Sequence, residues 1–574
     1  MSSELETKAK GGGTMDGREY TISEVVDSFG ITKHTWYIFV ILSLAQLFDG
    51  YDFMIINSTN MFVAHTFWPD NPTPGALMGS LTTWGLLGMV VGGALGGILS
   101  DRIGRKKVLI GAVLFYGLFT LPQAFANDLG FFAAFRFLAG LGVGSCIPIV
   151  YTFFSETVPS NRRGFFITCG GAVMVFGWVV AGLVANAVCS STTPLLGDFT
   201  NPVEYVNADG TTGSMFANWR LCYIIGAIPI AYAIFLHFAM AESPHWYANT
   251  GQTEKALEAL EDIEYHSVGT RTKRDPSLLV VPPRPESTAP STLFSKRYII
   301  GTCAIWSICF VGQFCVYGMN AWLPTWFSGI GYTPSEAITL QTWNNVAAII
   351  ANSIVGYISD TVGRKRCLIF SWVLCIVVIV ACSMFVQPNA MVLCVFLMCA
   401  FGFALNFSIS SIYPLMPEQY PTAVRNTGTA WCQAFARFGG SASSIVLGGI
   451  AAMPIFQVDG ATNWSWVVLI LNVPFVLALI CTLVFVRDTD GKSLDTLVTE
   501  SAERDTDTGK TAFAIMMTII VILFILCIVC PLAVPGWSKL PISLPLMSIG
   551  ILLPFVFFFI MGGSQLAREK KAAA

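Results

Sequence analysis

The chain has 574 residues, of which 54% are hydrophobic and only 12% are charged, whereas soluble domains carry roughly 25% charged residues. This composition excludes an ordinary soluble protein. The formal net charge is -3 and the basic residues are confined to short loops, which excludes a nucleic-acid partner. The apolar residues fall in repeated blocks of about twenty, the length that crosses ~30 Å of hydrocarbon as a helix. Because these blocks lack the alternation of porin strands, we predict an all-α membrane protein.

The first part of the chain predicts a cytoplasmic segment followed by six spanning helices. Residues 1–35 are polar and contain no cleavable signal peptide. The predicted bundle over residues 36–240 contains six apolar blocks, at about 36–57, 77–99, 107–126, 130–152, 165–188 and 220–240. Residues 241–297 are charged and rich in proline, which predicts a cytoplasmic linker with one short helix around Thr253 to His266.

The second part predicts another six-helix bundle and two additional helices. The bundle over residues 298–487 contains blocks at about 298–327, 335–359, 367–386, 390–414, 427–453 and 464–486. A polar connector, 488–510, separates it from the segment 511–564, whose two apolar blocks cover about 511–534 and 541–563. Residues 565–574 form a polar tail. The predicted total is fourteen spans.

Lysine and arginine lie on one side of this arrangement. The basic loops contain Arg102, Arg105, Lys106, Lys107, Arg162, Arg163, Arg364, Lys365, Arg366 and Arg425. The opposite loops, including the long segment 189–218, contain no lysine or arginine before Lys539. Cytoplasmic loops retain positive charge, so we predict a multi-pass protein of the plasma (inner) membrane with both termini in the cytoplasm. The alternative, that the charges merely solvate loop ends, does not explain their one-sidedness.

Two loop motifs occur once in each predicted bundle. Gly97-Ile-Leu-Ser-Asp101-Arg-Ile-Gly104-Arg105-Lys106-Lys107 corresponds to the stretch from Gly356 to Arg366, which reads Gly-Tyr-Ile-Ser-Asp-Thr-Val-Gly-Arg-Lys-Arg. The stretch from Tyr151 through Glu156 and Pro159 to Arg163 likewise corresponds to the stretch from Tyr413 through Glu418 and Pro421 to Arg425. Both pairs recur at nearly the same offset, which indicates an internal repeat. We expect the glycines to let helix ends approach closely and the aspartate to accept hydrogen bonds from a helix N-terminus.

These loops resemble the signature between helices 2 and 3, and 8 and 9, of the major facilitator superfamily. The resemblance implies two six-helix bundles with pseudo-two-fold symmetry, in which the loops latch the halves together on the cytoplasmic side and loosen when the transporter opens inward. The candidate gating residues are Gly97, Asp101, Arg102, Gly104, Arg105, Glu156, Arg163, Asp360, Gly363, Arg364, Glu418 and Arg425. The alternative is that the loops serve as topological anchors alone.

The first span carries two carboxylates, Asp49 and Asp52, near its middle. Three residues apart, they lie near one helical face. A charged side chain at this depth costs ~2.5–3.5 kcal/mol on insertion scales, so we expect both to face an aqueous cavity and at least one to take up a proton. Arg136, in the fourth span, is the natural partner of one of them. The alternative is a purely structural cluster. The glycines Gly140 to Gly144 after Arg136 predict tight helix packing.

Arg437 has no nearby acidic residue along its own span. A guanidinium matches a carboxylate in bidentate geometry, so we expect Arg437 to contact an anionic substrate. The alternative is an ion pair with Asp49 or Asp52 across the cavity. Aromatic and amide side chains at mid-depth are further candidates for the binding pocket, although each could instead serve helix packing. They are Tyr51, Trp178, Gln313, Tyr317, Trp343, Asn344, Asn345 and Asn406.

Three of these stretches resemble the aromatic acid:proton symporter family. They are Asp49-Gly-Tyr-Asp52, Gly140-Leu-Gly-Val-Gly144 followed by Pro148, and Arg437-Phe-Gly-Gly. By this resemblance Asp49 and Asp52 are required for proton-driven uptake and Arg437 is an anion contact. Trp219-Arg220, Glu242-Ser243-Pro244 and the stretch from Asp488 to Leu494 resemble the broader sugar-porter group instead. The two C-terminal spans and the loop 189–218 depart from the family's usual twelve helices.

The sequence therefore predicts a proton-coupled symporter of a small organic anion, such as an aromatic acid or another carboxylate, working by alternating access. The alternatives are a phosphate, sugar or sugar-acid proton symporter or facilitator, and a transporter-like sensor. We expect no enzyme, no cofactor and no metal site, because the five histidines are scattered and no catalytic motif has its context. The partners are the lipid bilayer, protons and the substrate, in a monomer or a weak dimer formed through the two extra helices.

Overall fold

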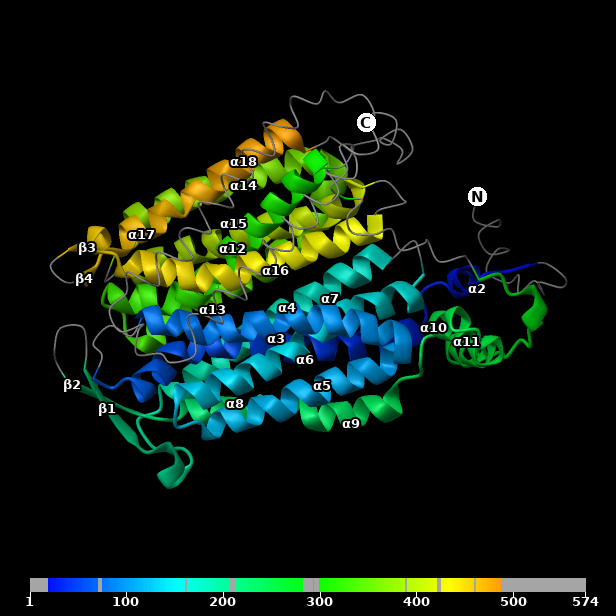
Figure 1. Cartoon of the computed structure of the whole chain (residues 1–574), viewed down its shortest axis with the longest axis horizontal. Coiled ribbons are helices and arrows are strands. Elements are labelled where there is room, and N and C mark those ends of the chain that lie inside the picture. The colour runs from blue at the N-terminus through cyan, green and yellow to red at the C-terminus, as the bar shows by residue number, and fades with distance from the viewer. Residues whose placement is uncertain are drawn as a thin grey trace, which may run out of the picture.

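The computed structural model describes residues 19–70, 75–159, 163–206, 212–281, 293, 299–387, 390–420, 425–458 and 461–486. Long helices form two sets that lie side by side, one from each half of the chain (Figure 1). Two short hairpins lie at one end of the molecule. The predicted spans at 511–534 and 541–563 fall outside the described residues, so the total of fourteen stays a prediction.

The helices of the N-terminal half are α3 to α9, preceded by a short α2 and followed by α10 and α11. Their bounds, with the intervening 3₁₀ turns and strands, are α2 (Ile22–Phe29), α3 (Lys33–Phe67), α4 (Gly75–Ile103), α5 (Arg105–Thr120), η1 (Leu121–Phe125), α6 (Leu129–Thr157), α7 (Arg163–Cys189), η3 (Gly197–Thr200), β1 (Pro202–Val206), β2 (Thr212–Phe216), α8 (Trp219–Ile225), α9 (Pro229–Ala239), α10 (Pro244–Asn249), α11 (Thr253–Val268) and η4 (Pro276–Leu278). Strands β1 and β2 pair antiparallel. Helix α11 confirms the helix predicted in the linker.

The C-terminal half repeats this plan. It consists of α12 (Ile299–Gly329), α13 (Pro334–Val362), α14 (Arg364–Phe385), α15 (Met391–Glu418), α16 (Arg425–Ala452), η6 (Pro454–Phe456), β3 (Gln457–Val458), β4 (Ala461–Thr462), α17 (Trp464–Ile470) and α18 (Asn472–Phe485). Within the described residues, ten helical segments are long and apolar enough to span a membrane. Helices α13 and α16 are equally long but less apolar, and they pack against α7 and α4 of the other half.

Two predicted spans differ from the structure in one respect each. Helix α3, predicted to end near residue 57, continues to Phe67. Its polar stretch is buried inside the protein: the Ser58 hydroxyl donates to Gln341 at 3.1 Å and the Thr59 hydroxyl donates to the Ile55 carbonyl oxygen at 2.7 Å. The span predicted at 220–240 is confirmed as Trp219–Ala239, but a turn divides it into α8 and α9, because Pro229 starts a new helix.

Glycines bring α4 and α6 into close contact. A Cβ atom added at Gly140 would lie 2.2 Å from the carbonyl oxygen of Gly85, and one added at Gly144 would lie 2.1 Å from that of Met89. Side chains at these positions would therefore push the two helices apart. This confirms the tight packing predicted from the glycine spacing, and it places Arg136, one turn before Gly140, against the other helices of its bundle.

The two ends of the molecule differ. At the end that carries β1 to β4, which we call the hairpin end, hydrogen bonds join the halves: Asn186 of α7 donates to Thr339 at 3.2 Å and accepts from Ser335 at 2.7 Å. At the opposite, basic-loop end, the helices of the two halves diverge (Figure 1). A Cβ added at Gly97 or at Gly356 would meet no atom within 4 Å. The expected close approach of helix ends at these two glycines is therefore wrong for this conformation.

A small second core lies at the basic-loop end, next to α10. It packs α2 against α11 through Ile22, Val25, Leu257 and other apolar residues. Beside it, Arg274 donates to Glu264 at 2.7 Å. Burial alone would raise the pKa of Glu264, but hydrogen bonds from Arg274 and Thr272 outweigh it and hold that pKa below its ordinary value.

Candidate functional site

Asp52 of α3 and Arg136 of α6 form a buried ion pair in the middle of the N-terminal half. Arg136 donates from Nη1 to Asp52 Oδ2 at 3.0 Å and from Nη2 to the Asp52 carbonyl oxygen at 2.8 Å. The hydroxyl of Thr120 donates to Asp52 Oδ1 at 2.6 Å. The expected pairing of Arg136 with an aspartate of the first span is confirmed. Every oxygen of the Asp52 carboxylate has a partner.

Asp49, one turn earlier on α3, has a different environment. It is 1% exposed, and its two carboxylate oxygens accept no hydrogen bond in the described part of the chain. The charged groups that act on it are Arg437, from the other half, and Asp52. The sequence predicted that both aspartates face an aqueous cavity, but here both are buried. An ionised Asp49 would be a buried charge without a hydrogen bond, which is energetically costly.

Arg437 of α16 lies across the interface from Asp49. Its Nη1 atom is buried and has no hydrogen-bond partner among the described atoms, and no acidic side chain of the described residues forms a salt bridge with it. Its charge acts on Asp49 and on three tyrosines, Tyr151, Tyr317 and Tyr413. A direct ion pair with an aspartate, the alternative that the sequence left open, is not formed in this conformation.

Two glycines after Arg437 explain how α16 comes so close to α12. A Cβ at Gly439 would lie 2.2 Å from the carbonyl oxygen of Phe310, and one at Gly440 would lie 2.1 Å from the ring of Tyr317. Side chains at these two positions would displace the helix or the ring. The Arg437-Phe-Gly-Gly stretch thus brings the Tyr317 ring against α16, and the charge of Arg437 acts on this tyrosine.

Aromatic rings line the same region. Phe53 of α3 contacts Tyr317 and Trp178, with ring centroids 4.8 Å and 5.6 Å away, respectively. Gln313, one turn before Tyr317, donates to the Tyr413 hydroxyl at 3.1 Å. The structure therefore brings three of the predicted pocket residues, Trp178, Gln313 and Tyr317, to the central interface around Asp49 and Arg437.

Other predicted pocket residues point elsewhere. The Tyr51 hydroxyl donates to the Cys222 carbonyl oxygen at 2.9 Å, inside the N-terminal half, and Asn406 donates to its own helix at Gly402. Trp343 is 45% exposed, so it lies on the face of α13 opposite the buried Asn344 and Asn345.

The two asparagines belong to a chain of buried amides that reaches α3. Asn344 donates to Asn320 at 3.4 Å and to Asn345 at 3.3 Å. Gln341 donates to the Asn320 carbonyl oxygen at 2.7 Å and accepts from Ser58. These amides therefore hold α12, α13 and α3 together, while Asn344 Oδ1 and Asn345 Nδ2 have no hydrogen-bond partner in the described structure.

Sequence reasoning missed several residues at the interface. Tyr151 and Tyr413 begin the two copies of the second repeated motif, and this equivalence was the available signal for them. Gln46 precedes Asp49 by three residues, so the two share a helical face, and both of its side-chain amide atoms are buried without a partner in the described structure. No feature of the sequence marked Phe53 as an interface residue, because single phenylalanines are common in membrane-spanning helices.

The first copy of the basic loop forms a polar network. Arg105 pairs with Asp101 at 3.0 Å and with Glu156 at 3.3 Å, and Ser243 donates to Glu156. The backbone amide of Lys106, in the first turn of α5, donates to Glu242. The acceptor at this helix N-terminus is therefore Glu242 and not the expected Asp101. Every one of these contacts lies within the N-terminal half and the start of the linker.

The remaining gating candidates are only partly described. Gly104 and Gly363 both have positive φ, 114° and 98°, at the same place in the two loops, a conformation that favours glycine. Arg102 is exposed, and Arg364 begins α14. The side chains of Arg163, Asp360, Glu418 and Arg425 lie outside the described residues.

Two helical halves around a central ionisable site define a multi-pass membrane transporter. The chain belongs to the Major Facilitator Superfamily, whose model matches residues 42–444 and again residues 329–569. This agrees with the prediction of a transporter rather than an enzyme.

Known transporters resemble the chain over most of its length. It is 29% identical to the niacin transporter NiaP of Acinetobacter baylyi, over 74% of this chain and 88% of that protein. It is 26% identical to the gallate transporter of Pseudomonas putida, over 75% and 89%, and 23% identical to the benzoate transport protein of Acinetobacter baylyi, over 87% and 99%. The fold is similar to that of the partially occluded, inward-open xylose transporter XylE from E. coli, with a TM-score of 0.61 and 18% identity over 80% and 100% of the two chains.

Proposed function

We propose that this protein is a proton-coupled symporter of small organic acids, with single-ring aromatic carboxylates as its preferred substrates, and that it works by alternating access. The observation that carries the proposal is the pairing, across the central interface, of a carboxylate and a guanidinium that each lack a hydrogen-bond partner in the described structure: Asp49 and Arg437. The named substrates of its relatives, niacin, gallate and benzoate, support the substrate class.

In this proposal Arg437 binds the substrate carboxylate. The free Nη1 can donate to an anion, and a planar guanidinium binds a carboxylate through two parallel hydrogen bonds. Phe53, Tyr317 and Trp178 supply flat apolar surfaces for an aromatic ring beside it. These features favour an aromatic acid over phosphate, which has no apolar ring, and over a neutral sugar, which does not need a buried guanidinium.

Asp49 is the proposed proton site. Protonation removes the cost of a buried, unbonded charge, and it removes a negative charge that attracts Arg437 across the interface. Asp52, by contrast, is bonded by Arg136 and Thr120, and this ion pair holds α3 in place. Proton and substrate then neutralise the central site together, and only the neutral site allows the two halves to rock.

We further propose that the basic-loop end is cytoplasmic, following the positive-inside rule. The two halves are then joined at the outer, hairpin end and separated at the cytoplasmic end. The ion pairs of Arg105 keep its loop in the position from which it can contact the C-terminal half when the cytoplasmic end closes. The proposal includes fourteen spans, with the last two outside the described residues, in a monomer or weak dimer.

Uptake of radiolabelled benzoate and nicotinate into proteoliposomes tests the proposal. The wild type should accumulate them only with an inward proton gradient, and Arg437→Ala should lose uptake whereas Arg271→Ala, at an exposed arginine of the linker, retains it. A bidentate charged contact contributes about 1.5–3 kcal/mol, so Arg437→Ala should weaken binding roughly ten- to a hundredfold. Gradient-insensitive uptake by the wild type, or equal uptake by both arginine variants, would overturn the proposal.

A further inference from the structure

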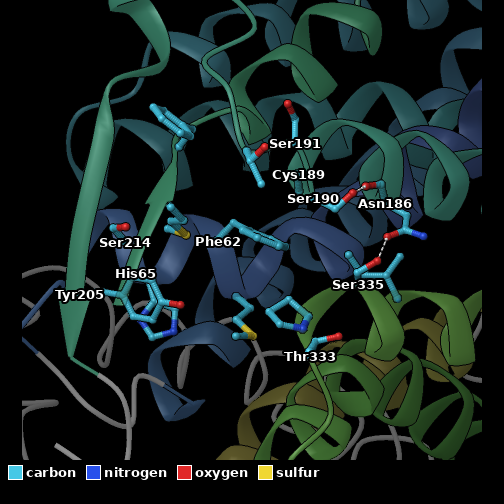
Figure 2. Close-up of a pocket in the computed structure, with 16 residues that line it drawn as sticks. Phe62, His65, Asn186, Cys189, Ser190, Ser191, Tyr205, Ser214, Thr333 and Ser335 are labelled. Atoms are coloured by element: carbon cyan, nitrogen blue, oxygen red, sulfur yellow. Dashed lines mark hydrogen bonds between the residues drawn. The ribbon is translucent and has the colours of Figure 1, made fainter. Parts of the chain in front are cut away.

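A cavity of about 410 Å³ lies at the hairpin end, far along α3 from the central site. Figure 2 shows how it forms between the hairpin β1–β2, the C-terminal ends of α3 and α7, and the first turn of α13. Its volume falls in the range of roughly 300–1,000 Å³ that is typical of small-molecule sites. None of the central residues, Asp49, Arg437 or Tyr317, lines it.

His65 provides the polar group that a ligand would meet. Its side chain is buried, with 6% exposed, and lines the cavity, where it stacks against Tyr205 of β1 with ring centroids 4.3 Å apart. Its Nδ1 atom has no hydrogen-bond partner in the described structure. Neither ring nitrogen of His65 forms a hydrogen bond in the described structure, so the imidazole that lines the cavity is available to a ligand.

The rest of the lining combines hydroxyl groups with apolar walls. Ser191, Ser214 and Thr333 bring hydroxyls to the cavity, and Phe62 and Tyr205 bring ring surface. Thr333 and Ser335 also mark the start of α13, where the Glu336 carboxylate already accepts from the Thr333 amide at 2.9 Å. Hydroxyls and an imidazole around aromatic rings suit a flat molecule with a hydrogen-bonding polar group such as a carboxylate.

Hydrogen bonds fix the position of the segment that forms one wall of the cavity. The Val206 amide of the hairpin donates to the Pro69 carbonyl oxygen at 2.9 Å, and Asn218 donates to the Thr193 carbonyl oxygen at 3.0 Å. Trp219 donates to Thr66 on α3 at 3.0 Å. The described parts of the segment 189–218, which departs from the usual pattern of the family, therefore form a fixed wall of the cavity.

The cavity also touches the contacts that join the two halves. Asn186, which lines it, bonds Ser335 and Thr339 of α13, and a dashed line in Figure 2 marks the first of these bonds. A molecule in the cavity would therefore contact both halves beside the hydrogen bonds of Asn186 that join them at the hairpin end. It would add to the contacts that keep this end shut.

We propose that this cavity is a second binding site for the single-ring aromatic acid, separate from the Arg437 site and in contact with both halves of the closed hairpin end. The inference rests on the proposed function for the identity of its ligand. The carboxylate bonds His65 and the neighbouring hydroxyls, and the ring lies against Tyr205 and Phe62. An acid molecule bound in this cavity would be the next one to enter the central site.

Equilibrium binding of radiolabelled benzoate to the purified full-length protein tests this. The wild type should bind two equivalents, and His65→Ala should bind one. Ser214→Trp fills the cavity from an exposed position of β2 and should also bind one, so the test does not depend on the folding of the His65 variant. Arg437→Ala should lose the other equivalent. His237→Ala, the same change at an exposed histidine of α9, should retain both.

The outcomes separate the two proposals. One equivalent in the wild type, lost in Arg437→Ala but kept in His65→Ala and Ser214→Trp, would overturn the second site and leave the proposed function standing. Two equivalents that neither His65→Ala nor Ser214→Trp reduces would also overturn the second site. No binding of benzoate or nicotinate to the wild type would contradict the proposed function, and the second site with it.

Discussion

Replacing Arg136 by methionine should destabilise the protein severely. The Arg136 and Asp52 side chains are 3% and 1% exposed, so solvent does not screen their interaction. The change removes the ion pair at 3.0 Å and the bond to the Asp52 carbonyl oxygen, and leaves Thr120 as the remaining partner of the carboxylate among the described residues. Removing one member of a buried pair costs about 3–5 kcal/mol. This is a factor of roughly 150 to 4,000 in the folding equilibrium.

Denaturation of the detergent-solubilised protein measures this cost. Arg136→Met combined with Asp52→Asn should recover at least half of the loss, because no uncompensated charge remains in the bundle. Arg102→Met, the same change at an exposed arginine, should cost less than about 0.5 kcal/mol. The reasoning would be refuted if Arg136→Met were no worse than Arg102→Met, or if the double variant lost the sum of both single losses.

Three further predictions concern packing, pH and gating. Gly140→Ala should lower the midpoint of thermal unfolding, because its Cβ would lie 2.2 Å from a carbonyl oxygen of α4 and overpacking costs typically ~1–3 kcal/mol. Since the pKa of Glu264 lies below its ordinary value of 4.5, its stabilising effect is present above that value and is lost as the pH falls through the lowered pKa. Hydrogen exchange of α11 should therefore accelerate below about pH 4.5 in the wild type but not in Glu264→Gln. Arg105→Ala, which breaks the loop network, should slow benzoate uptake by about tenfold while leaving equilibrium binding unchanged.

Matched variants sharpen these predictions. Gly97→Ala adds a methyl group where no atom lies within 4 Å, and it should leave the unfolding midpoint unchanged. Equal losses in Gly140→Ala and Gly97→Ala would refute the packing argument. An unchanged pH profile in Glu264→Gln would show that another group titrates. If Arg105→Ala weakened binding and uptake equally, the loop would act on the substrate site and not on the rate of closure.

The sequence predicted the helices well where composition alone decides them. Blocks of apolar residues have no alternative to a helix inside a bilayer, so the middle of each predicted span is helical in the described structure. The ends were harder to place. The stretch around Ser58 and Thr59 looks like the end of a span because it is polar, yet α3 continues, since Gln341 of the other half bonds Ser58. Hydropathy measures composition and contains no information about such distant partners.

The charged residues of the site were predictable because charges are rare inside membrane spans. Residues whose role depends on the rotation of a helix or on tertiary contacts were not. A buried charge is costly without a partner of opposite sign, so the ion pair of Arg136 and Asp52 was predictable. Tyr51 was a predicted pocket residue because it is an aromatic side chain at mid-depth, but each residue turns the helix by about 100°, which points Tyr51 toward Cys222. Tyr151 reaches Arg437 only through the packing of the two halves, and Tyr413 reaches it through the packing of α15 against α16.

The central claim is that the proton which drives transport binds Asp49. Proteoliposomes containing Asp49→Asn can be compared with the wild type in two modes, exchange of labelled for unlabelled benzoate and accumulation driven by an inward proton gradient. Asparagine imitates the protonated aspartate, so the account predicts that exchange is retained whereas gradient-driven accumulation is lost. Accumulation by Asp49→Asn at the level of the wild type would contradict it.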